Sequence, residues 1–296
     1  MRIVLFGKDG QVGSALRAIL PPAWEVTALG RRDADLAIPG AAASAVRAAR
    51  PDVVINAAAW TAVDRAEEEP GAARRVNAEA VAEMAEAVGD GVLVHYSSDY
   101  VFDGRKAGAY RETDPTGPLS AYGRSKQLGE AAAARAPRHL IFRTSWVHAP
   151  RHANFIATIL RLAATRDSLR VVADQIGAPT AAALIAEVTL RAIAMVDSGR
   201  PPPAGIYHLA AKGETSWHNY ARFLIETAAA SGAALRCRAD DIAAVASSDY
   251  PQPARRPRNS RLDTTKLETT LGLSLPDWRD GVRDTVAATL AEEAVA

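Results

Sequence analysis

Short apolar runs alternate with longer amphipathic segments through the first half of the chain. The runs are bounded by glycine or polar residues, which is typical of buried strands, and the segments between them repeat apolar positions at the helical period. The predicted strands are Arg2–Phe6, Glu25–Leu29, Val53–Asn56, Val92–His95 and Leu140–Phe142, and the predicted helices lie near residues 13–20, 41–50, 72–88 and 121–135. This alternation predicts an α/β fold, a doubly wound, Rossmann-like parallel sheet with helices on both faces.

The pattern loosens after about Trp146. A helical segment near 154–165 and strand-like runs at Leu169–Val172 and Ile206–Leu209 come first, and helices near 216–230 and 277–293 follow. We therefore predict a dinucleotide-binding Rossmann domain over residues 1–145 and a smaller lobe, mainly substrate-binding, over residues 146–296. Segments near 169–211 are expected to return to the Rossmann sheet. Ligands of such folds bind beyond the carboxyl ends of the strands.

Composition and charge narrow the class of partner. The 296 residues are 48% hydrophobic and 23% charged, as in ordinary globular proteins, and a formal net charge of +1 offers a nucleic acid no electrostatic attraction. The longest apolar stretch, Ala178–Val196, contains Glu187 and Arg191, which favours a partly buried helix over a membrane span. A single cysteine, Cys237, excludes an intrachain disulfide and suits a reducing compartment. We expect a cytoplasmic enzyme without nucleic-acid or membrane partners.

Three glycines follow the first predicted strand and open the first predicted helix. The segment reads Gly7-Lys8-Asp9-Gly10-Gln11-Val12-Gly13, with G-x-x-G-x-x-G spacing. Positions without a side chain let the backbone approach a pyrophosphate, which rests on the amino terminus of the helix. The sequence therefore predicts that Gly7, Gly10, Gln11, Val12 and Gly13 bind a dinucleotide.

The end of the second predicted strand bears on the choice of cofactor. Arg31 and Arg32 stand where an acidic residue would hydrogen-bond a ribose 2′-hydroxyl, and a guanidinium instead suits the 2′-phosphate of NADPH. Two solvated arginines in a surface loop are the alternative. Asp33 could also reach a ribose, so NADH stays possible.

A hydroxyl and a Tyr–Lys pair supply candidate carbonyl chemistry. Ser98 closely follows the fourth predicted strand, and Tyr122 and Lys126 are one helical turn apart on one face of a predicted helix. The ordinary pKa of tyrosine is about 10, and a neighbouring ammonium stabilises the phenolate and lowers that pKa. A serine hydroxyl can bond the carbonyl oxygen. These three residues are therefore predicted to protonate and orient a carbonyl group during its reduction.

The glycine loop, the Ser98–Tyr122–Lys126 set and Asn56-Ala57-Ala58-Ala59 together resemble the extended short-chain dehydrogenase/reductase family. Longer strings are similar to one branch of that family, which reduces a nucleotide-linked keto-sugar. They are N-A-A-A-W-T-A-V-D (56–64), S-D-Y-V-F (98–102), F-R-T-S-W (142–146), D-Q-I-G-A-P-T (174–180) and P-A-R-R-P-R-N-S-R-L (253–262). The resemblance runs from Met1 to about Val286. It implies NADPH-dependent reduction of the C4 ketone of dTDP-4-dehydro-L-rhamnose to dTDP-L-rhamnose.

The resemblance also implies individual roles. Tyr122 donates the proton and, with Lys126, bonds the nicotinamide ribose, while Ser98, usually threonine in the family, orients the carbonyl. The other implied cofactor-binding residues are Arg31, Asp35, Leu36, Ala57, Ala58 and Ala59. The implied substrate-binding residues are Val63, Ser98, Asp99, Phe102, Trp146 and Arg256. Trp146 could instead be a core residue, and Arg256 could lie in a solvated loop, although a nucleotide diphosphate needs cationic donors.

Two other functions fit the same fold. A sugar epimerase or dehydratase is one, but Asp99 is followed by Tyr100 rather than by the second acid that we associate with dehydration. A non-catalytic, NADP-binding regulatory subunit is the other, and the retention of Ser98, Tyr122 and Lys126 argues against it.

One departure from the family concerns metal. Some members are thought to dimerise around magnesium held by glutamates, and the matching positions here are Ala15, Ala183 and Ala288, which cannot ligate a metal. Acids stand near these positions in the sequence, namely Glu187, Glu292 and Glu293. We predict that no metal is bound and that the protein is a monomer or a metal-independent dimer.

Overall fold

The computed structural model describes the backbone of residues 1–293 and the side chains of residues 1–291. Its centre is a six-stranded sheet with the strand order β10-β5-β4-β3-β1-β2. The strands are β1 (Arg2–Phe6), β2 (Glu25–Leu29), β3 (Val53–Asn56), β4 (Val92–Ser98), β5 (His139–Thr144) and β10 (Gly205–His208). Every neighbouring pair is parallel, which confirms the predicted α/β doubly wound fold.

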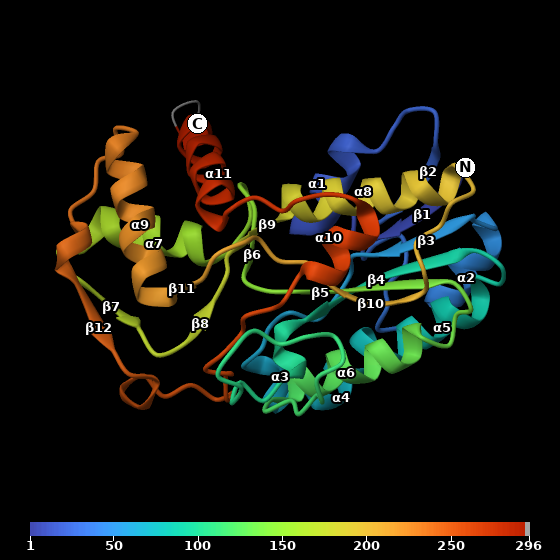
Figure 1. The fold of residues 1–296 in the computed structure, drawn as a ribbon, viewed down its shortest axis with the longest axis horizontal. Helices are drawn as coiled ribbons and strands as arrows, with labels where there is room; N and C mark the ends of the chain where they lie inside the picture. Colours follow the sequence, from blue (N-terminus) through green and yellow to red (C-terminus); the bar gives the residue numbers. More distant parts are fainter. Residues whose placement is uncertain (294–296) are drawn as a thin grey trace.

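Helices cover both faces of this sheet (Figure 1). Helices α1 (Gln11–Ile19) and α8 (Ala182–Asp197) lie on one face, and α2 (Ala41–Ala49), α5 (Ala80–Ala87) and α6 (Ala121–Ala133) lie on the other. Strand β1 alternates between the two cores, because Ile3 and Leu5 join the cluster with α1 and α8 while Val4 and Phe6 join the cluster with α2 and α5. A strand buried on both faces reads as a continuous apolar run, which is why the sequence located it correctly.

The helix predicted near residues 72–88 is present as a helical run over residues 70–87, with one π-helical turn inside it. Short helices α3 (Arg65–Glu68) and α4 (Pro70–Arg74) lead into a π-helical turn, η1 (Arg75–Glu79), which precedes α5. The turn contains Asn77, a buried residue whose side chain bonds Ser125 of α6 and the backbone of Trp60. Widening of the helix at one turn places this polar side chain against its partners, a constraint that hydrophobic periodicity does not report.

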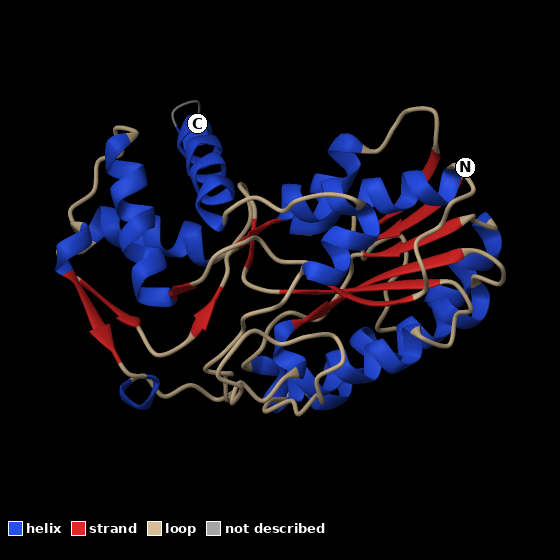
Figure 2. Ribbon diagram, viewed as in Figure 1, coloured by secondary structure: helices blue, strands red, loops and turns tan. Residues whose placement is uncertain are grey.

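The second lobe has its own apolar core, formed by α7 (Phe155–Thr165), α9 (Trp217–Ala230) and α11 (Trp278–Glu293). Figure 2 shows its short strands away from the central sheet. The remaining elements are β6 (Val147–His148), β7 (Leu169–Val172), β8 (Ile176–Gly177), β9 (Thr180–Ala181), β11 (Thr215–Ser216), β12 (Ile242–Val245), α10 (Thr265–Leu271) and three 3₁₀ turns, η2 (Asp99–Val101), η3 (Ala239–Asp241) and η4 (Ser247–Asp249). Of the segments expected to return to the central sheet, β10 extends it beside β5, whereas β7 pairs with β12 outside it.

Two further observations concern the predicted second lobe and the predicted absence of a membrane span. Residues 294–296, at the end of the predicted second lobe, lie outside the described residues. Within residues 1–293, no helix combines the length and the apolar character that a membrane crossing requires.

Candidate functional site

A cavity of about 780 Å³ opens at the carboxyl ends of β1, β3 and β4. The strand order reverses between β1 and β3, and ligands of doubly wound folds bind in the crevice at this reversal. Most residues predicted to bind a cofactor line the cavity: Gly7, Gly10, Gln11, Val12, Arg31, Asp35, Leu36, Ala57, Ala58, Ala59, Tyr122 and Lys126. Gly13 is not among the lining residues.

The glycine loop is built for close approach. Gly7 has a φ of 80°, and a Cβ atom there would lie 2.6 Å from the amide nitrogen of Ala58. A Cβ atom on Gly13 would lie 2.0 Å from the carbonyl oxygen of Gly7, so Gly13 packs α1 against the loop. Gly10 is the N-cap residue of α1 and supplies no side-chain cap, which leaves the amides of the first turn for an anionic ligand. These features fit a dinucleotide pyrophosphate.

The end of β2 distinguishes Arg31 from Asp33. Arg31 lines the cavity with a side chain that is 84% exposed, and its Nε lies 3.3 Å from Asp35. Asp33 accepts hydrogen bonds from Lys8 Nζ at 2.6 Å and from the Gly30 amide at 2.8 Å, and these two bonds lower its pKa. The carboxylate of Asp33, which could have met a ribose hydroxyl, is therefore already bonded to Lys8 and to the Gly30 amide.

Tyr122 and Lys126 line the cavity, and Ser98 is buried next to the lining residue Ser97, at the end of β4. Ser98 is the last residue of β4, and its Oγ donates to Asp99 Oδ1 at 2.9 Å and accepts from the Tyr100 amide at 3.1 Å. Ser98 also acts on the Tyr122 hydroxyl, whose pKa it lowers. Lys126 is buried and donates from Nζ to the carbonyl oxygen of Tyr96 at 2.5 Å. Strand β4 and helix α6 thus bring together three groups that the sequence separates.

The pKa of Tyr122 differs from the sequence expectation in its direction. Burial raises this pKa to about 12, the charge of Asp99 raises it further, and the hydrogen bond with Ser98 opposes both. In this structure the Lys126 ammonium donates to the Tyr96 carbonyl oxygen. That Lys126 stabilises the phenolate form of Tyr122 stays a prediction. The phenol keeps its proton at neutral pH, as a proton donor must.

Behind Lys126 lies a buried ionic network that the sequence interpretation missed. Glu130 accepts from Arg143 Nε at 2.8 Å, from Arg143 Nη2 at 2.7 Å and from Ser97 Oγ at 2.5 Å. Burial lowers the pKa of Lys126 to about 8, and the charge of Glu130 opposes that shift. Two signals could have revealed the network: Glu130 follows Lys126 by one helical turn, and Arg143 interrupts an apolar strand.

On the substrate side, Arg256 reaches back to the loop that follows β3. Its Nη1 and Nη2 donate to the two carboxylate oxygens of Asp64 at 3.1 and 2.8 Å, and Tyr100 lies near enough to raise the pKa of the guanidinium. The Tyr100 ring meets the Tyr122 ring edge to face, with centroids 5.7 Å apart. Arg256 is therefore connected through one aromatic residue to the candidate proton donor. Sequence reasoning assigned no role to Asp64 or Tyr100.

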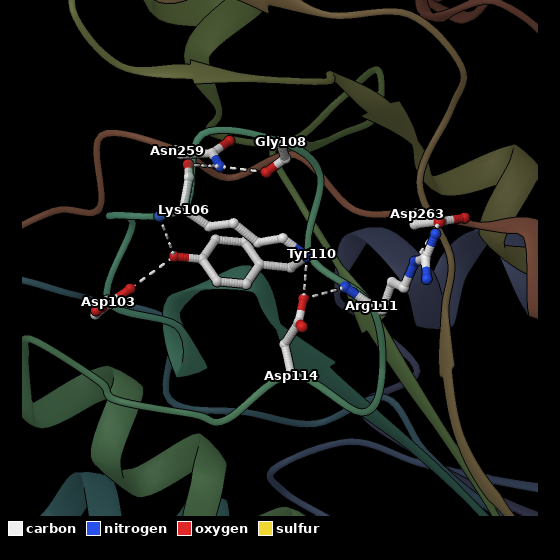
Figure 3. A network of polar contacts seen from close by, with 8 residues as sticks. All are labelled: Asp103, Lys106, Gly108, Tyr110, Arg111, Asp114, Asn259 and Asp263. Carbon is white, nitrogen blue, oxygen red and sulfur yellow. Dashed lines mark hydrogen bonds and ion pairs between the residues drawn. The ribbon is translucent and has the colours of Figure 1, made fainter.

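The segment that carries Arg256 is anchored by the network drawn in Figure 3. The Asn259 side-chain amide donates to the carbonyl oxygens of Lys106 and Gly108 at 2.7 and 2.8 Å. Tyr110 donates from its hydroxyl to Asp103 at 2.6 Å, and the Asp263 amide donates to its carbonyl at 2.7 Å. The loop after β4 and the segment that crosses to the second lobe are thus held as one unit.

The remaining predicted substrate residues lie in three environments. Asp99 is buried, and burial raises its pKa to about 6 against hydrogen bonds from Ser260 and Ser98. Val63 is half-buried in the loop before α3. Trp146 is also half-buried, has a φ of 48°, and stacks on Trp217 with centroids 3.7 Å apart.

Phe102, which is also predicted to contact substrate, lies in the core in this structure. Its side chain is fully buried, stacks on Tyr110 with centroids 4.1 Å apart, and packs against His208 and the Arg143 guanidinium. Its contact with substrate stays a prediction.

Comparisons with known proteins agree with this geometry. The family model of the RmlD substrate binding domain matches residues 1–291. A dTDP-4-dehydrorhamnose reductase from Shigella flexneri is 47% identical over 291 residues and is covered to 96%, as is this chain. The solved structure of a dTDP-4-dehydrorhamnose reductase from Clostridium acetobutylicum has a TM-score of 0.87 at 31% identity and covers 97% of this chain and 98% of its own.

A second solved structure bears on the cofactor. The dTDP-4-dehydrorhamnose reductase from Bacillus anthracis, in complex with NADP, has a TM-score of 0.86 at 29% identity, with 96% of this chain and 98% of that chain covered. The family model and the full-length identities together establish membership. This chain belongs to the RmlD family of short-chain dehydrogenase/reductases, together with the dTDP-4-dehydrorhamnose reductases that it matches along nearly its whole length.

Proposed function

We propose that this protein reduces the C4 ketone of dTDP-4-dehydro-L-rhamnose to give dTDP-L-rhamnose, with NADPH as reductant. The observation that carries the proposal is that Tyr122 and Lys126 line the same cavity as the glycine loop, with Ser98 at the end of the adjoining strand β4. The reductases from Shigella flexneri and Clostridium acetobutylicum, which match this chain at full length, support the choice of substrate.

The lining of the cavity fits NADPH. The backbone around Gly7 and Gly10 has room for a pyrophosphate, and Arg31 offers an exposed guanidinium for a 2′-phosphate, while Asp33 is bonded to Lys8. The Bacillus anthracis relative was solved with NADP. Bound NADPH supplies the hydride that reduces the carbonyl carbon.

The protein's own residues perform the proton chemistry. Tyr122, whose pKa burial raises to about 12, enters the reaction protonated and donates that proton to the carbonyl oxygen as negative charge develops there. Ser98 orients the same oxygen through its hydroxyl. Lys126 lies one helical turn from Tyr122, and its ammonium stabilises the phenolate that is left after proton transfer.

Arg256 is our candidate for the substrate diphosphate. Its guanidinium is a planar fork suited to phosphate oxygens, and Asp64 holds it beside Tyr100 at the edge of the catalytic residues. Val63, Asp99 and Trp146 are proposed to contact the sugar or the base.

The test is NADPH consumption with dTDP-4-dehydro-L-rhamnose, compared with a UDP-linked keto-sugar, with the product identified by NMR. Oxidation of NADPH with formation of dTDP-L-rhamnose is expected, and the UDP-linked compound should react more slowly. Product formation without net NADPH consumption would indicate an epimerase or a dehydratase. Tight NADPH binding with no turnover of either sugar would instead indicate a regulatory subunit.

A further inference from the structure

The loop that joins β6 to α7, residues 149–154, crosses from the second lobe to the first turn of α1. Asn154 donates to Gln11 Oε1 at 3.0 Å, Gln11 lies 3.4 Å from the carbonyl oxygen of Val147, and His152 Nε2 lies 3.1 Å from Ser14 Oγ. His152 and Ala153 also line the cavity that contains Gly7, Gly10 and Lys126. The loop therefore borders the cavity beside the first turn of α1.

The contact with Ser14 decides which nitrogen of His152 is left for a ligand. Ser14 Oγ lies 3.1 Å from His152 Nε2 and 3.0 Å from the carbonyl oxygen of Gln11, so the hydroxyl lies between the ring and the backbone of α1. A hydroxyl both donates and accepts, so it can pair with Nε2 in either tautomer of the ring. The ring is held through Nε2, and Nδ1 is left to meet a ligand.

The positions of the positively charged side chains along the cavity indicate what His152 Nδ1 binds. Among the described residues, four side chains that line the cavity can carry positive charge: Arg31, Arg75, Lys126 and His152. Arg31 lies at the end of β2, Arg75 is bonded to Glu83 at 2.6 Å, and Lys126 lies beside Tyr122 at the other end. His152 alone of the four contacts α1, whose amino terminus fits the pyrophosphate.

We propose that His152 is a further cofactor-binding residue, which donates from Nδ1 to the pyrophosphate of the dinucleotide while Ser14 holds its ring. In the tautomer that carries its proton on Nδ1, the ring donates to a phosphate oxygen while Nε2 accepts from Ser14 Oγ. A hydrogen bond to a charged phosphate belongs to the stronger class. This inference rests on the proposed use of a dinucleotide cofactor.

The experiment measures binding in the absence of substrate, by isothermal titration of the full chain. The ligands are NADP⁺, 2′-phospho-ADP-ribose, which retains the pyrophosphate, and adenosine 2′,5′-bisphosphate, which lacks it. We expect His152→Ala to weaken the first two by roughly tenfold, as the loss of one charged hydrogen bond does, and the third by less than about twofold. His152→Gln and Ser14→Ala should give intermediate losses with the same ligand pattern.

The matched control is His218→Ala, because the His218 ring bonds the Ile242 carbonyl oxygen in the second lobe and does not line the cavity. This variant should leave all three dissociation constants unchanged. Unaltered binding of NADP⁺ by His152→Ala would overturn the inference, and so would equal weakening of all three ligands, which would show damage to α1. If the wild-type protein bound none of the three ligands, the proposed dinucleotide cofactor itself would be wrong. That result differs from normal binding by the wild type with no effect of the His152 substitution.

Discussion

Asp64 and Arg256, 192 positions apart in the chain, form a two-pronged ion pair across the substrate side of the site. Asp64 also accepts from the Ala254 amide at 3.1 Å, so one carboxylate holds both the guanidinium and the backbone that carries it. The side chain of Arg256 is 17% exposed and that of Asp64 is 40% exposed, so solvent screens the pair and its value lies in position more than in stability.

Asp64→Asn should therefore impair substrate binding and leave the cofactor site intact. Loss of the carboxylate frees Arg256 to move away from Tyr100, and we expect KM for the nucleotide-sugar to rise by roughly fivefold, about 1 kcal/mol, with little change in Kd for NADPH. Steady-state kinetics and NADPH titration measure the two effects. Asp167→Asn is the control, since Asp167 makes a similar pair with Arg236 on the exposed surface. A KM equal to that of the wild type would argue against Arg256 as a substrate ligand.

Tyr122→Phe should abolish most turnover without loss of the cofactor. Removal of the proton donor is expected to lower kcat by roughly 100- to 10,000-fold, the usual contribution of a positioned acid. Kd for NADPH should stay within a few-fold of the wild-type value. Tyr250→Phe, at a tyrosine that is 49% exposed, is the control and should behave as wild type. A Tyr122→Phe enzyme with near wild-type kcat would remove the phenol from the mechanism.

The activity should decline above about pH 8 if Lys126 must be charged. Burial lowers the pKa of Lys126 to about 8, so its ammonium is present below that pH and is lost as the pH rises through it. The profile of kcat/KM, which reports the free enzyme, should show an alkaline limb near this value, and arginine at position 126 should remove the limb. A flat profile to pH 10 would contradict the assignment. Lys126→Ala should lower both kcat and the affinity for NADPH.

NADPH should be preferred over NADH, and Arg31 should account for the preference. Arg31 lines the cavity while Asp33 is occupied by Lys8, so Arg31→Ala is expected to reduce kcat/KM for NADPH by roughly tenfold, the value of one charged contact, and to change that for NADH little. Arg32→Ala is the control, because Arg32 does not line the cavity. Equal efficiencies of the two cofactors in the wild type would show that no arginine meets a 2′-phosphate.

Assembly and activity should not depend on magnesium. Ala15 is half-buried against the core on α1, Ala183 is exposed on α8, and neither offers an oxygen to a hard cation. The side chains of Glu292 and Glu293 lie outside the described residues. Sedimentation equilibrium in magnesium and in EDTA should give the same mass, and activity should be equal in both. Dissociation on chelation, or activity restored by magnesium alone, would refute the prediction.

The sequence alone determined the parts of this protein that depend on local periodicity. Strand β1, the glycine loop and the start of α1 are continuous in the chain, so apolar runs and glycine spacing located them together. Tyr122 and Lys126 share a helix, so their common face follows from helical geometry. The sequence strings that resemble the family extended these predictions to Ser98 and Arg256. The structure brings these two residues to one side of the sheet.

Only the tertiary structure decided what depends on packing between distant segments. Phe102 lies in the core, because Tyr110 and His208 pack against its ring. Strand β7 pairs with β12 outside the central sheet, and burial raises rather than lowers the pKa of Tyr122. A hydrophobic pattern shows that a residue is buried but not which segments bury it, and a pKa depends on that enclosure. Long-range partners such as Asp64 and Arg256 are chosen by the fold as a whole, so the structure alone could reveal them.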